Sequence, residues 1–173
     1  MNTANRPSAV IVGAGIGGLC AALALRRIGW NATVLERRAG AADGGSGISL
    51  WPNAMRVLES LGVADQLLDV AATLSPEGGL RTPSGRWLTR TRPGDAPLVE
   101  VVLLHRADLH SVLRGALPAE CIRTGVTVDG LTGLAAGQGQ PPAQRQPPAA
   151  SKECPRVLAR GAEGRFELTA EGG

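Results

Sequence analysis

The stretch SAVIVGAGIGGLCAALALRRIGWNATVLERR, residues 8–38, decides the fold. It begins with a short apolar run at 9–12, rich in β-branched residues, which predicts a buried strand. A helical apolar pattern follows over 16–28 with Gly29 as its natural end, and a second apolar strand is expected over 32–36. A strand, a helix and a second strand within about thirty residues form a crossover unit whose two strands run parallel.

Three glycines in the turn before the helix, Gly13, Gly15 and Gly18, form a GxGxxG pattern. Gly13 permits the tight turn, Gly15 lets a pyrophosphate approach the backbone, and Gly18 lets the helix pack closely on the strand. The N–H groups of the first helical turn then face the phosphates at the positive end of the helix dipole. Glu36 ends the second strand, where its carboxylate can accept hydrogen bonds from both hydroxyls of an adenosine ribose. The unit therefore predicts a dinucleotide-binding site.

The same stretch permits two other interpretations. Residues 9–25 carry no charge and follow Arg6, which loosely resembles an export or membrane segment. Two features count against this interpretation. Four glycines lie in the middle of the run and would weaken a continuous helix. The whole run would also make a helix of only about 25 Å, which is shorter than the ~30 Å hydrocarbon core of a membrane. A packed strand–helix–strand unit without a ligand is the other interpretation, but it leaves the acid at the end of a buried strand unexplained.

Composition limits the class of protein. A chain of 173 residues with 43% hydrophobic residues is typical of one soluble globular domain. The net charge is +3, the basic residues are scattered, and only 2% of residues are aromatic, so we expect no nucleic-acid partner. Three cysteines without CxxC spacing or a nearby histidine pair predict neither a disulfide framework nor a metal site, and they favour a reducing cytoplasm.

The rest of the chain completes the predicted architecture. After a small-residue loop at 39–49, the patterns predict helices at 52–62, 63–70 and 108–117, a hairpin at 80–88, and strands at 98–104, 126–131 and around the GAEG turn at 161–164. Five of the twelve prolines lie between 141 and 155, which indicates a linker.

We therefore expect an α/β, Rossmann-like fold, with a parallel sheet carrying helices on both faces and a partial β-meander near the end. The expected organisation is one domain over 1–132, a Pro/Gly/Gln-rich linker or insertion at 133–154, and a terminal β-hairpin of the same domain at 155–173.

Three blocks of this sequence resemble one family, the FAD-dependent monooxygenases of the aromatic-hydroxylase type. GAGIGGLCAALALRRIGWNATVLERR (13–38) is similar to the family's amino-terminal FAD fingerprint, and GISLWPNAMRVLESLGVADQL (47–67) to the segment that follows it. LLHRADLHSVL (103–113) resembles its Arg-containing helix entry. The resemblance implies FAD as cofactor, NAD(P)H as co-substrate, and hydroxylation by O2 of a small, aromatic substrate.

The resemblance also implies roles for particular residues. The pyrophosphate would be lined by the residues of the glycine turn, Gly13, Gly15, Ile16, Gly17 and Gly18. Glu36 would hold the adenosine ribose with Arg37 beside it, and Gly47 would approach the flavin. Arg106 would reach the flavin, although a solvent-exposed arginine at a helix start is the other interpretation. No residue is assigned a catalytic role, and His105 and His110 are expected to be structural or exposed.

The second and third flavin-binding motifs of the family are not found in this sequence. PGDAP at 93–97 resembles the third motif but precedes the Arg106 block, so it is interpreted as a turn. We therefore expect this chain to be the truncated front part of such an enzyme. We expect the chain alone to bind FAD weakly or not at all and to be inactive. Two alternatives remain, an NAD-dependent dehydrogenase domain and a non-catalytic nucleotide-binding fragment.

Overall fold

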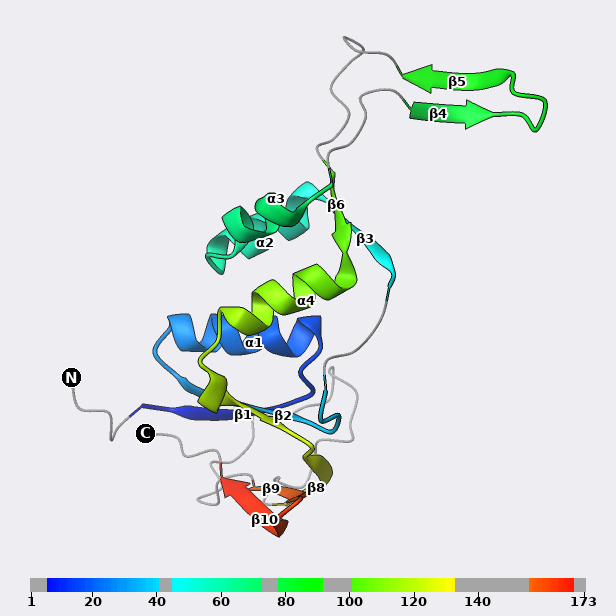
Figure 1. Ribbon diagram of the computed structural model, residues 1–173. Coiled ribbons are helices and arrows are strands. Elements are labelled where there is room, and N and C mark those ends of the chain that lie inside the picture. Colours follow the sequence, from blue (N-terminus) through cyan, green and yellow to red (C-terminus); the bar gives the residue numbers. More distant parts are fainter. Residues whose placement is uncertain (1–5, 41–44, 73–77, 92–100, 133–155, 170–173) are drawn as a thin grey trace, which may run out of the picture. The chain divides into compact units, whose positions relative to one another are not determined.

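The computed structural model (Figure 1) describes residues 6–40, 45–72, 78–91, 101–132 and 156–169. The chain divides into two compact units, one from Met1–Ala42 with Leu113–Gly173, the other from Asp43–Val112. The predicted linker at 133–154 and the PGDAP turn lie outside the described residues.

The first unit is built on a parallel sheet with the strand order β1-β2-β7. β1 (Ser8–Val12) pairs with β2 (Asn31–Glu36), and β2 pairs with β7 (Ile122–Thr124), in both cases parallel. Helix α1 (Ile16–Arg27) connects β1 to β2, so the predicted crossover unit is confirmed. Gly29, which follows the helix, has φ +90 and donates its N–H to the carbonyl oxygen of Arg26.

Helix α1 covers one face of this sheet. Its buried residues are Leu19, Ala22 and Leu23, and it packs along β1 and β2. Side chains alternate between the two faces of a strand, so Ile11, whose side chain lies near the Gly18 position of α1, shares this face with its partner Val34. Val34 is fully buried.

An antiparallel meander covers the opposite face. Its strands β8 (Thr127–Thr132), β9 (Arg156–Gly161) and β10 (Gly164–Thr169) are arranged in the order β10-β9-β8. Leu35, which points away from α1, is buried with Val126, Val157 and Ala159 from this part of the chain. Figure 1 shows α1 on one side of β1 and β2 and the meander on the other. The expectation of helices on both faces is therefore wrong for this unit, because the meander occupies the second face.

The second unit combines helices with two antiparallel strand pairs. β3 (Gly47–Leu50) pairs with β6 (Val102–His105), and β4 (Gly78–Arg81) pairs with β5 (Trp87–Thr91). Helix α2 (Pro52–Ser60) begins with proline in its first turn, as predicted, and α3 (Ala64–Val70) packs against it. Their shared apolar face is buried and comprises Met55, Leu58, Leu61, Ala64 and Leu67. Helix α4 (Arg106–Gly115) follows β6 directly and crosses the boundary between the units at 112–113. In the first unit, a 3-10 turn at Ala119–Cys121 then leads into β7.

The structure differs from the sequence prediction at several element boundaries and at one strand. β3 begins at Gly47, inside the stretch expected to be a loop, because pairing with β6 overrides its glycine and serine content. Helix α4 begins at Arg106 instead of 108. The strand β7 was not predicted, since three residues carry no recognisable period. Among the described residues, no helix is long and apolar enough to cross a membrane.

Candidate nucleotide-binding site

The glycine turn between β1 and α1 is shaped by two positions that exclude a side chain. Gly13 has φ +102, a left-handed conformation that favours glycine, and its N–H donates to the carbonyl oxygen of Leu35 at 2.7 Å. A Cβ added to Gly18 would collide with the carbonyl oxygen of Gly13 and would lie 3.1 Å from its carbonyl carbon. The turn therefore brings the start of α1 into direct contact with the end of β1.

The start of α1 is open at the positions where a ligand would approach. Gly15 is the N-cap residue, and no side chain caps the helix. A Cβ built on Gly15 or Gly17 would meet no atom within 4 Å. The first N–H groups of a helix lack intrahelical acceptors, and the helix dipole favours negative charge there. Because the first turn holds no acidic residue, the geometry fits a bound phosphate group.

Glu36 lies at the carboxyl end of β2 and contacts the glycine turn. Its Oε2 accepts a hydrogen bond from the Ala14 N–H at 2.9 Å, and its Oε1 accepts one from the Arg38 N–H at 2.9 Å. The backbone hydrogen bonds from Arg38 and from Ala14 lower the pKa of the Glu36 carboxyl from its ordinary value, and the charges of Arg38 and Arg37 act in the same direction. Partial burial opposes them. Glu36 is therefore held as a carboxylate beside the turn.

The predicted site residues fall into two groups. The first group belongs to the first unit and lies in the turn before α1, in the first turn of α1, and at or just after the end of β2: Gly13, Gly15, Ile16, Gly17, Gly18, Glu36 and Arg37. Arg37 is exposed. Gly47 and Arg106 belong to the second unit, where Gly47 pairs with His105, and the Arg106 N–H donates to the Ser46 carbonyl oxygen at 2.9 Å. The pairing of β3 with β6 thus places Gly47 beside the start of α4.

The sequence did not indicate three backbone groups of the site. These are the N–H groups of Ala14 and Arg38 and the carbonyl group of Leu35, which form the hydrogen bonds described above. Backbone groups have the same chemistry in every residue except proline, so no residue type marks them. The one sequence feature that pointed toward these backbone groups was the position of Glu36 at the end of β2.

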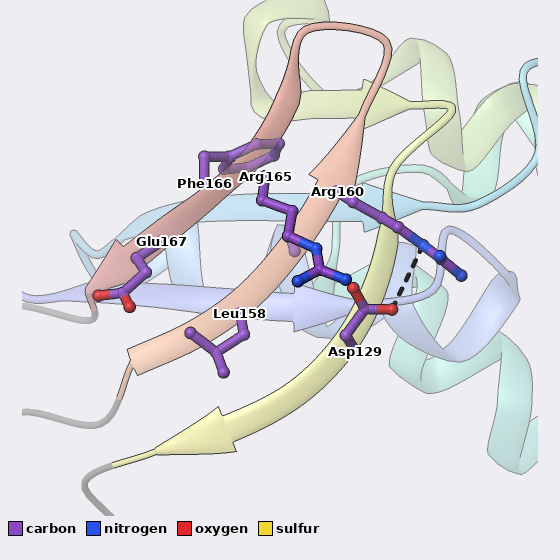
Figure 2. A pocket seen from close by; sticks show the side chains of 7 residues that line it. Asp129, Leu158, Arg160, Arg165, Phe166 and Glu167 are labelled. Atoms are coloured by element: carbon purple, nitrogen blue, oxygen red, sulfur yellow. Dashed lines mark ion pairs between the residues drawn. The ribbon is translucent and has the colours of Figure 1, made fainter.

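A separate pocket of about 450 Å³ lies on the meander (Figure 2). Its charged lining residues are Asp129, Arg160, Arg165 and Glu167. Arg160 Nε lies 3.3 Å from Asp129 Oδ1, and both side chains are more than a third exposed. Exposed ion pairs of this kind are usual on a solvated sheet face. None of the predicted site residues lines this pocket.

Metal and disulfide chemistry find no support in the described part of the chain. No group of three or more potential metal-ligating side chains occurs there. Cys20 and Cys121 are both free thiols, and Cys121 Sγ accepts a hydrogen bond from Arg26 Nη1 at 3.1 Å. Burial raises the pKa of the Cys20 thiol, so this residue is a weak nucleophile.

Comparison with known families identifies the cofactor of this domain. The model of the FAD binding domain family matches residues 6–122, which contain the glycine turn, Glu36 and Arg106. The chain belongs to this family. FAD is therefore its cofactor, and the NAD-dependent alternative is not favoured. The uncapped start of α1 is chemically suited to phosphate groups, and the neighbouring Glu36 carboxylate is suited to hydroxyl groups, both of which FAD carries.

Two curated relatives show the kind of enzyme in which this domain occurs. The chain is 39% identical over 124 residues to a 3-amino-4-hydroxybenzoate 2-monooxygenase of Streptomyces platensis, covering 69% of this chain and 31% of the relative. It is 30% identical over 118 residues to a 6-hydroxynicotinate 3-monooxygenase of Bordetella bronchiseptica, covering 66% of this chain and 31% of the relative. The chain thus spans about a third of the length of the curated relatives it matches.

Solved structures share the fold. The p-nitrophenol 4-monooxygenase of Pseudomonas putida superposes with a TM-score of 0.69 at 19% identity, over 95% of this chain and 38% of that one. Klebsiella pneumoniae HpxO, solved with FAD and uric acid, gives a TM-score of 0.67 at 21% identity, over 95% and 37% respectively. At this identity the likeness establishes the fold, which is the α/β FAD-binding fold predicted from the sequence.

Proposed function

We propose that this chain is the FAD-binding part of a flavin-dependent monooxygenase that hydroxylates a small aromatic substrate with NAD(P)H and O2. The observation that carries the proposal is the uncapped start of α1, held beside the Glu36 carboxylate by the glycine turn. The relatives act, by their names, on ring compounds such as 3-amino-4-hydroxybenzoate, 6-hydroxynicotinate and 3-hydroxybenzoate. We extend this substrate class, a small hydroxylated ring, to the present protein.

The first unit would hold the adenosine diphosphate part of FAD. The N–H groups at the start of α1 would face the pyrophosphate, and the open space at Gly15 and Gly17 would admit it. A carboxylate offers about four lone-pair sites, and backbone amides use two of those on Glu36. The remaining sites can accept hydrogen bonds from the ribose hydroxyls. The negative charge of Glu36 would also reject a 2′-phosphate.

The second unit would contribute the residues that the resemblance places toward the flavin, Gly47 and Arg106. When bound, FAD passes electrons from NAD(P)H to oxygen, and this chemistry belongs to the cofactor. The residues of this chain bind and orient it, and no described residue is assigned a proton transfer. We further propose a cytoplasmic location, which the free thiols of Cys20 and Cys121 support.

A binding experiment on the purified chain tests this proposal. A ligand that binds the folded state alone raises its thermal stability. Because the chain is expected to bind FAD weakly at best, ADP and FAD are supplied at millimolar concentration, where they should raise the melting temperature. Gly15→Ala should leave the melting temperature of the free chain unchanged, because its Cβ meets no atom within 4 Å. It should weaken ligand binding tenfold or more, since an atomic overlap costs about 1–3 kcal/mol and each 1.4 kcal/mol is a factor of ten.

Gly130→Ala is the matched control. Gly130 lies on β8 in the same unit, and an added Cβ there also meets no atom within 4 Å. This variant should bind ADP and FAD as the natural chain does. Equal affinity of the Gly15→Ala variant and the natural chain for both ligands would show that the phosphates do not approach this turn.

A further inference from the structure

Glu36 connects three parts of the first unit through hydrogen bonds to the backbone. Its two carboxylate oxygens bind the N–H groups of Ala14 and Arg38, each at 2.9 Å. Its own carbonyl oxygen accepts from the Val126 N–H at 2.9 Å, where the chain enters the meander. The side chain is therefore engaged with the protein itself, in addition to any contact with a ligand.

The hydrogen bond to Ala14 completes a two-point attachment of the glycine turn. Consecutive amides of the turn, those of Gly13 and Ala14, are held by consecutive residues of β2, since Leu35 provides its carbonyl oxygen and Glu36 its carboxylate. A second hydrogen bond to the adjacent amide restricts the orientation of the turn more than the first bond alone does. The second attachment is charge-assisted and is therefore the stronger type of hydrogen bond.

A glycine-rich turn needs such an attachment more than other turns do. Four of the six residues at 13–18 are glycines, and glycine loses more backbone freedom on ordering than any other residue. A site that is ordered before its ligand arrives avoids that entropy cost during binding.

We propose that Glu36 is a positioning residue, which holds the glycine turn in its phosphate-binding conformation through the Ala14 amide before any nucleotide is bound. The positioning role serves nucleotide binding and so rests on the proposed function. The hydrogen bond itself is present in the free protein. It is separate from the acceptance of ribose hydroxyls, because different lone pairs are used. Removal of Glu36 should therefore weaken the phosphate contacts as well as the ribose contacts.

The first test uses the free chain and needs no ligand. Amide hydrogen exchange, followed residue by residue by NMR, should show protection of the Ala14 and Arg38 amides in the natural chain. Glu36→Ala should increase exchange at both amides at least tenfold, and Glu36→Gln, with one acceptor oxygen, should leave one of them protected. The control variant Glu163→Ala removes an exposed carboxylate from the β9–β10 turn. It should leave hydrogen exchange at the Ala14 and Arg38 amides unchanged. Unchanged exchange of the Ala14 amide in Glu36→Ala would overturn the proposal.

Acid titration of the free chain gives a second readout in the natural sequence. The Ala14 and Arg38 amide resonances should move together with one midpoint as Glu36 is protonated. The midpoint should lie below the ordinary glutamate value, since the hydrogen bonds from the Arg38 and Ala14 amides favour the carboxylate and lower its pKa, and the charges of Arg38 and Arg37 act in the same direction. Separate midpoints for the two amides would show that they do not share this carboxylate.

The second test separates positioning from ribose recognition. Affinities of the natural chain and of Glu36→Ala are compared for ADP and for 2′,3′-dideoxy-ADP, which lacks both ribose hydroxyls. If Glu36 positions the turn, its removal should weaken both ligands at least tenfold. If it acts on the ribose alone, the variant and the natural chain should bind the dideoxy ligand equally, which would refute the positioning role. If the natural chain binds neither ligand, the proposed function fails, and the exchange experiment still decides whether Glu36 holds the turn.

Discussion

The contact between Gly18 and Gly13 makes Gly18→Ala a sharp test of the turn geometry. The added Cβ would collide with the carbonyl oxygen of Gly13, and the neighbouring carbonyl carbon and Ile11 Cγ2 lie 3.1 and 3.4 Å away. The obstructing atom is backbone, so no rotamer change removes the overlap, and a cost of about 3 kcal/mol is expected. Replacing a helical glycine by alanine returns up to about 1 kcal/mol, which leaves a net destabilisation of about 2 kcal/mol.

The neighbouring variant Gly17→Ala provides the control. Gly17 is also in the first turn of α1, but its Cβ would meet no atom within 4 Å, so alanine should be neutral or stabilising by up to about 1 kcal/mol. For a chain of this size 1 kcal/mol changes the melting temperature by about 2–4 °C. Gly18→Ala should therefore melt roughly 4–8 °C below the natural chain in differential scanning calorimetry. Equal melting temperatures for the two variants would refute the close approach of α1 to β1.

Three further predictions concern titration, reactivity and the hairpin. The folded pKa of Glu36 is lowered from its ordinary value of 4.5, so its contribution to stability is present above that value and is lost as the pH falls through the folded pKa. The free energy of unfolding, measured with urea at about pH 6 and at about pH 3, should fall less between these two pH values for Glu36→Gln than for the natural chain. Burial raises the pKa of Cys20, so iodoacetamide should label it more slowly in the folded than in the unfolded chain, as measured by peptide mass spectrometry. Gly79→Ala should speed hydrogen exchange of the β4 and β5 amides, because Gly79 has φ +152 and its Cβ would collide with the Thr89 carbonyl oxygen.

The strand–helix–strand unit could be predicted because each local signal indicates the same structure. The β-branched run, the glycine turn, the apolar stripe of α1 and the stop at Gly29 all agree with the observed elements. Proline at the start of α2 was equally informative. Gly13 and Gly18 meet backbone requirements that glycine alone satisfies, a left-handed φ at Gly13 and the close approach of α1 to the turn at Gly18.

The remaining features depend on contacts between distant segments. β3 consists of Gly47–Leu50, whose composition is that of a loop, and its strand geometry comes from pairing with β6 some fifty residues later. β7 is a strand because β2 accepts it as a parallel neighbour. The sequence indicated a ribose contact for Glu36 but could not reveal its bond to the Ala14 amide. Such a bond depends on the relative placement of two chain segments, which no local pattern encodes.

The burial of Leu35 under the meander affects how the protein folds during synthesis. The ribosome delivers β1, α1 and β2 first, whereas Val157 and Ala159, which cover Leu35, are made more than a hundred residues later. At about 5–20 residues per second, the delay is on the order of ten seconds. Until β9 is made, Leu35 lacks two of the three buried residues that cover it, so we expect the nascent chain to need early chaperone contact until translation has passed β9.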